Sequence, residues 1–145
     1  MSDRALEVII RYERAAQHVA LLRKQIGEAI NRCSVSEQVR ELHSQGNYRE
    51  ADKLVDGLRE KTHLYLALTA KEPCDSGYGE AKLDEYGVQV WLEDDGCEHC
   101  IEAWRLICER RQARAEYGIA KRAIRAVGRG AIRRTTNEER RDGGC

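Results

Sequence analysis

The sequence contains no phenylalanine and only one proline among its 145 residues. Its apolar content is mostly Ala, Leu, Ile and Val, which suits helices that each bury a narrow stripe better than a thick aromatic core. No apolar run approaches the roughly 18 residues of a membrane-spanning helix. The first residues also lack the basic and apolar regions of a signal peptide. We therefore expect a helical protein of the cytoplasm.

The chain has no net charge, because its 25 basic and 25 acidic residues cancel. The two signs are unevenly placed: residues 1–100 carry 13 basic and 19 acidic side chains, whereas residues 101–145 carry 12 and 6. A net charge of zero gives no general attraction to nucleic acid, so any such binding has to be local. Either the two parts complement each other, or the basic part meets a partner.

Signatures of catalysis are missing as well. The sequence has no phosphate-binding loop, dinucleotide fingerprint, nucleophile elbow or zinc-protease motif. Asp94 and Asp95 precede an expected helix and are typical of helix capping, not of an acid–base pair. We therefore expect a protein that is not an enzyme.

Two long segments repeat apolar residues at spacings of three and four. The first runs from Ala5 to Cys33 and the second from Ala103 to Ala131, which predicts long helices over residues 1–33 and 97–134. An antiparallel pairing that sets Ala5 opposite Ala131 also brings Cys33 opposite Ala103. The same seams would also fit a homodimer, so monomer and homodimer both stay open.

The segments between and after these helices are shorter. Residues 34–72 predict a helical hairpin, in which 62–70 is ambiguous between helix and strand. Residues 73–96 predict a Gly-punctuated loop with a short strand, because apolar residues alternate from Tyr86 to Leu92. Residues 135–145 predict a flexible tail. The expected fold is mainly α: one domain over residues 1–134, with a long antiparallel helical hairpin and a small helical, zinc-loop head.

The cysteines indicate a metal site. Cys97 and Cys100 form a C-x-x-C pair at a helix start, a spacing that lets two sulfurs face one ion. The antiparallel pairing brings Cys33 within about one turn of Cys100, and Cys74 opens the loop that returns to Cys97. These four cysteines predict a structural zinc site. The alternatives are that the thiols bind no metal or that two of them form a redox pair. One of the four could be replaced by His63, His99 or Cys108.

The last helix also carries a basic face. Its members follow helical spacing and could track a phosphate backbone; they are Arg122, Arg125, Arg129 and Arg133. No aromatic residues interleave with them for base stacking. A nucleic-acid-binding regulator is therefore the alternative function.

Residues 96–133 carry a resemblance to known proteins. Cys97-Glu98-His99-Cys100 opens a long helix that has the sequence Ala-Lys-Arg-Ala-Ile-Arg at 120–125 near its end. This pattern resembles small bacteriophage or prophage accessory proteins, some of which inhibit host defence or redirect host transcription. The resemblance implies binding to a host protein in the host cytoplasm. We expect a zinc-stabilised protein-binding module, with Trp91 and Tyr78 as candidate anchors because aromatic residues dominate interface energetics.

Overall fold

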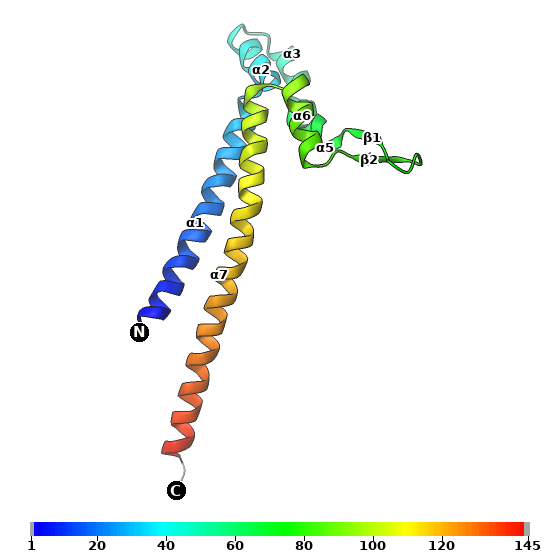
Figure 1. The fold of residues 1–145 in the computed structure, drawn as a ribbon. Coiled ribbons are helices and arrows are strands. Elements are labelled where there is room, and N and C mark those ends of the chain that lie inside the picture. Colours follow the sequence, from blue (N-terminus) through cyan, green and yellow to red (C-terminus); the bar gives the residue numbers. More distant parts are fainter. Residues whose placement is uncertain (1, 144–145) are drawn as a thin grey trace. The chain divides into compact units, whose positions relative to one another are not determined.

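The computed structural model describes residues 2–143, apart from the side chain of Arg59, and is shown in Figure 1. The described part of the chain is mainly helical, as the sequence predicts, with one small antiparallel pair of strands. Its elements are α1 (Asp3–Asn31), α2 (Ser34–Ser44), α3 (Tyr48–Val55), α4 (Leu58–Lys61), α5 (His63–Thr69), β1 (Lys71–Pro73), β2 (Glu80–Lys82), α6 (Glu85–Asp95) and α7 (Glu98–Asp142).

The chain divides into two compact units, and each long helix contributes to both. The first unit contains residues up to 22 together with those from 109 onward, and the second contains residues 23–108. The division therefore follows packing and not chain order, and the expectation of one domain over residues 1–134 stays a prediction. Within residues 2–143, the helices lack the combination of length and apolar character that a bilayer span requires.

In the first unit, α1 and α7 pack side by side along small and aromatic residues. Ala113 and Ala120 of α7 are buried, and their small side chains let the neighbouring helix approach closely. The rings of Tyr12 and Tyr117 lie 5.4 Å apart, with their hydroxyl oxygens at 3.2 Å. The Lys121 ammonium lies 4.3 Å from the centre of the Tyr117 ring, a cation–π contact. The predicted antiparallel hairpin is thus confirmed.

The register of this pairing differs from the expected one by about one heptad. The expected register sets Tyr12 opposite Ile124, whereas the structure places Tyr12 against Tyr117, seven residues earlier in α7. His18 and Glu109, 3.6 Å apart, agree with the observed register. A slide of seven residues brings equivalent seam positions together again, so apolar spacing alone cannot select the register. The paired tyrosines and the His18–Glu109 contact distinguish the two alternatives.

The last helix also continues further than expected. The predicted end at residue 134 is wrong, because α7 extends to Asp142. The Thr135 and Thr136 hydroxyls each donate to a carbonyl four residues earlier, so these polar side chains fit within the helix. The remaining part of the expected flexible tail, residues 144–145, lies outside the described residues.

The second unit gathers short helices around a small core. Val39, Ala51, Leu64 and Ala67 are buried on α2, α3 and α5, while α2 packs on α3 and α5 on α6. Residues 34–69 are helical, as predicted, but they form the four short helices α2 to α5 and not a single hairpin, and residues 71–72 belong to β1. The ambiguous 62–70 stretch forms α5. Thr62 is the N-cap of α5, where its hydroxyl accepts from the Tyr65 N–H at 3.3 Å.

The expected strand from Tyr86 to Leu92 is wrong, since these residues form α6. The Asp84 carboxylate caps this helix by accepting from the Gly87 N–H at 2.6 Å. Val88 and Leu92 stand four residues apart and are both buried on one face of this helix. The same apolar residues therefore fit the spacing of a helix as well as the alternation of a strand.

The strands lie earlier in the chain, as an exposed hairpin of β1 and β2. Its turn holds Gly77 and Gly79, both at φ +77°, a conformation that suits glycine.

Gly96 joins α6 to α7 at a point with no room for a side chain. A Cβ there would lie 2.6 Å from the Leu92 carbonyl oxygen, whereas a Cβ at Gly128 would meet nothing within 4 Å. We predict that Gly96→Ala lowers the free energy of unfolding by about 1–3 kcal/mol. Gly128→Ala is the control and should raise it by about 0.5–1 kcal/mol, because alanine favours a helix. Denaturant unfolding followed by circular dichroism measures both, and equal effects would contradict this packing.

Candidate metal centre

Four metal-ligating side chains from three separate segments meet in the second unit. Cys33 lies in the turn between α1 and α2, and His63 is the first residue of α5. Cys97 and Cys100 stand at the start of α7, immediately after the Gly96 turn. Their ligand atoms all lie within 4.8 Å of one another. The cluster forms because each residue sits at or next to a helix end, where the chain turns.

The spacing of these atoms is close to that of a tetrahedral metal site. In such a site, with metal–sulfur bonds of about 2.3 Å, neighbouring ligand atoms lie about 3.8 Å apart. The Cys33 sulfur is 3.3 Å from Nδ1 of His63, and no two ligand atoms of the cluster lie more than 4.8 Å apart. Small side-chain rotations therefore bring all four atoms onto one ion. Cys33 and Cys100 are fully buried, whereas His63 and Cys97 are half-buried.

Backbone amides at helix starts favour the thiolate form of Cys97. Partial burial alone raises the pKa of this thiol, but the N–H groups of Cys100 and Ser34 donate to its sulfur and outweigh burial. Hydrogen bonds with the His63 ring and the Cys100 thiol act in the same direction, and the pKa falls to about 6. These amides belong to the starts of α7 and α2, whose dipoles also favour a negative charge.

Cys100 has the opposite tendency. Burial raises the pKa of its thiol well above the ordinary value, and the neighbouring Cys33 and Cys97 sulfurs raise it further. The Leu64 N–H, at the start of α5, donates to this sulfur and partly offsets the rise. A buried sulfur among other sulfurs keeps its proton unless a cation compensates the charge, and a bound divalent metal ion would supply that compensation.

Three of the four predicted ligands belong to the cluster, but Cys74 does not. Cys74 lies in the β1–β2 hairpin, where its N–H donates to the Gly79 carbonyl and its own carbonyl accepts from the Gly77 N–H. His63 completes the cluster instead, as one of the replacements left open by the sequence. The other two candidates are elsewhere: His99 lies beside Glu98, with 3.5 Å between Nε2 and the carboxylate. Cys108 lies further along α7.

The other predicted site residues are placed as follows. The four arginines of the basic face are all exposed on α7: Arg122, Arg125, Arg129 and Arg133. Tyr78 is 87% exposed in the hairpin loop between β1 and β2. Trp91 is half-buried on α6.

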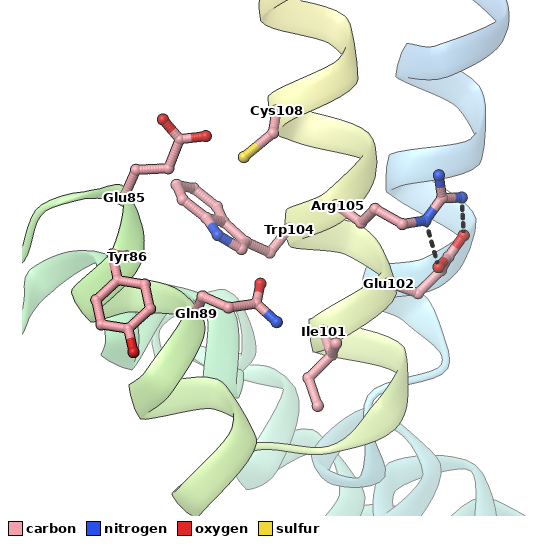
Figure 2. A pocket seen from close by; sticks show the side chains of 8 residues that line it. All are labelled: Glu85, Tyr86, Gln89, Ile101, Glu102, Trp104, Arg105 and Cys108. Atoms are coloured by element: carbon pink, nitrogen blue, oxygen red, sulfur yellow. Dashed lines mark hydrogen bonds and ion pairs between the residues drawn. The ribbon is translucent and has the colours of Figure 1, made fainter.

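A cleft between α6 and the start of α7 was not expected from the sequence. It has a volume of about 580 Å³ and lies between Tyr86 of α6 and Trp104 of α7, with Cys108 beside the indole (Figure 2). Glu102 and Arg105 lie at the side of the cleft. The Arg105 guanidinium donates two hydrogen bonds, of 2.6 and 2.9 Å, to the Glu102 carboxylate and lowers the pKa of Glu102. The sequence carries no signal for this cleft, because the alternation of apolar residues predicts a strand at Tyr86.

Comparison with protein-family models, with curated proteins and with solved structures finds no match for this chain. The metal-site hypothesis therefore depends on the geometry of the cluster.

Thr62 fixes the start of α5 and thereby the position of His63. We predict that Thr62→Ala costs about 1 kcal/mol in stability and lowers metal affinity by up to about tenfold. Asp84→Ala removes the equivalent cap of α6, which carries no cluster residue, and should lower stability without changing metal affinity. Competition with a chromophoric chelator measures affinity. Equal metal affinity in the two variants would show that the Thr62 cap does not position the ligand.

Proposed function

We propose that this chain is a non-enzymatic protein-binding module whose second unit is held together by a structural zinc ion. The observation that supports the metal site is the approach of four ligand atoms to within 4.8 Å of one another. The ligands would be Cys33, His63, Cys97 and Cys100.

The donor set favours zinc over magnesium and calcium. Three sulfurs and one imidazole nitrogen are soft and borderline ligands, which disfavours magnesium and calcium, since these ions prefer oxygen. Tetrahedral sites of three cysteines and one histidine are a standard form of structural zinc. The amides of Ser34, Leu64 and Cys100 that donate to the sulfurs supply the second layer of hydrogen bonds that such sites use.

A structural role fits this set better than a catalytic one. Four protein ligands complete the tetrahedron and leave no position at which water could be activated. The ion would join the end of α1, the start of α5 and the start of α7. Several buried positions of this unit hold small residues such as Ala51 and Ala67, so binding free energy from the metal would add to the stability of its fold.

Exposed aromatic residues support protein binding. Tyr78 is 87% exposed on the hairpin, and Tyr86 is 77% exposed beside the α6–α7 cleft. Exposed aromatic side chains supply large contact areas at interfaces. The hairpin and the cleft are therefore the proposed docking surfaces, with Trp91 on the same helix as Tyr86. A host protein as partner follows only from the resemblance to phage accessory proteins.

The zinc site predicts a specific pattern of metal loss. Protein purified without chelator should contain about one equivalent of zinc, measured by elemental mass spectrometry. Cys33→Ser and Cys97→Ser should each retain less than about half an equivalent. Cys74→Ser is the matched control, since it alters a cysteine of the same unit outside the cluster, and it should retain the metal.

Where a ligand variant fails to fold, the wild-type protein provides the second test. Chelation should shift the fluorescence of Trp91 and Trp104, both in the second unit, toward that of solvent-exposed indole, and added zinc should reverse the shift. Zinc below about half an equivalent in wild-type protein, or equal zinc loss from Cys74→Ser, would refute the assignment.

Protein binding predicts crosslinks from the aromatic surface. A photo-crosslinking amino acid at position 78 or 86 should capture one discrete protein from cells that contain the partner. The same amino acid at position 48 is the control, since Tyr48 is 61% exposed on α3 and belongs neither to the hairpin nor to the lining of the cleft. Adducts of equal yield from all three positions, or none from 78 and 86, would contradict the docking surfaces.

A further inference from the structure

The first unit carries a long run of positive charge on α7. Between residues 117 and 137 this helix has six basic side chains and no Asp or Glu. Such a run is unusual in a chain whose charges balance overall. An ordinary solvated helix face mixes both signs, which supports the helix through pairs spaced by three or four residues.

The arginines of this helix form one stripe. At 100° per residue, seven of them fall within an arc of about 100°: Arg111, Arg114, Arg122, Arg125, Arg129, Arg133 and Arg140. Of the acidic residues in the same part of α7, only Glu139 borders this arc. The others lie on the opposite half of the helix: Glu109, Glu116, Glu138 and Asp142.

Packing within the unit leaves the stripe facing outward. The buried Ala113 and Ala120, which lie against α1, stand on the half of α7 opposite the arginines. Within the described residues, the central arginines of the stripe form no ion pair, so the carboxylates of α1 do not neutralise them. These are Arg122, Arg125, Arg129 and Arg133.

Among the described residues of this unit, no helix lies beside the far end of α7. Because Tyr12 lies against Tyr117, the start of α1 at Asp3 is level with about residue 126 of α7. From 131 to 142 every residue of α7 is exposed. An unpacked helix of this length is marginal in water, so a bound partner would stabilise it.

We propose that the arginine stripe of α7 binds the phosphate backbone of double-stranded DNA. The stripe offers about one guanidinium per helical turn along roughly 16 Å between Arg122 and Arg133. A single α-helix fits the major groove of B-form DNA, which is about 12 Å wide, whereas the major groove of double-stranded RNA is too deep and narrow. Contacts to phosphates give binding that tolerates any sequence.

Two other anionic partners fit the surface less well. Single-stranded nucleic acid is held by aromatic side chains between the charges, and the stripe contains none. A membrane-surface helix needs a bulky apolar face opposite its basic one. Here that half of α7 carries the buried Ala113 and Ala120 and packs on α1 through Tyr117, so it is not free to enter a bilayer.

The test measures binding of the full-length protein to a labelled duplex of random sequence by fluorescence anisotropy at several salt concentrations. For the four central arginines, the logarithm of the binding constant should fall with a slope of about −4 against the logarithm of salt. The variant R122E/R125E/R129E should bind at least about 100-fold more weakly, and its slope should flatten by about three. R122Q/R125Q/R129Q, which preserves helix propensity, should show a smaller loss in the same direction.

The matched control is R4E/R11E/R14E, which changes the net charge by the same amount through exposed arginines of α1 in the same unit. It should retain binding within about threefold of wild type. Equal weakening by the two charge-reversal variants would overturn the proposal, because net charge and not the stripe would then control binding. Salt-independent binding, or preferential binding to single strands, anionic phospholipid vesicles or polyglutamate, would also overturn it. The substituted arginines lie in the first unit and the metal ligands in the second, so these variants should keep their zinc. Loss of DNA binding and loss of zinc therefore test the two proposals separately.

Discussion

The second unit depends on one geometric constraint, the meeting of four ligand atoms among the starts of three helices. Cys33, His63 and the Cys97–Cys100 pair come from segments far apart in the chain, yet their ligand atoms lie within 4.8 Å of one another. The amides at the starts of α2, α5 and α7 donate to the cysteine sulfurs. The same N–H groups that a helix start leaves unsatisfied therefore favour negative charge at this point. The turn at Gly96 contributes to the cluster because it joins the end of α6 to the start of α7 and so positions Cys97.

The first unit depends on a different interaction, the close packing of two helices along small residues. Ala113 and Ala120 are buried against α1, and the Tyr12–Tyr117 pair fixes which turns face each other. This arrangement also determines what the unit presents to its surroundings. Because the alanines point toward α1, the arginines on the other half of α7 point away from it. The packing that buries one face therefore leaves the charged face available.

The sequence predicted most of the metal ligands, and the one error has a clear cause. The C-x-x-C spacing identified Cys97 and Cys100 directly, and antiparallel helices placed Cys33 near them. The position of Cys74 after Pro73, at the start of a glycine-containing loop, predicts that it is the fourth ligand. The loop instead pairs with itself as the β1–β2 hairpin. His63 occupies the remaining position because Thr62 caps α5 and sets the start of that helix. Neither the hairpin nor the cap position could be inferred from ligand spacing.

By itself, the sequence determined the helical class, the two long helices and the cysteine pair, because each follows from spacing within one short segment. Only the tertiary structure decided the register of α1 against α7, since a shift by one heptad preserves the apolar pattern. It also decided that residues 85–95 form a helix, since Val88 and Leu92 satisfy both an alternating and a helical pattern. The identity of the fourth ligand was likewise decided by the fold, because distances between separate segments are set by packing and not by local sequence.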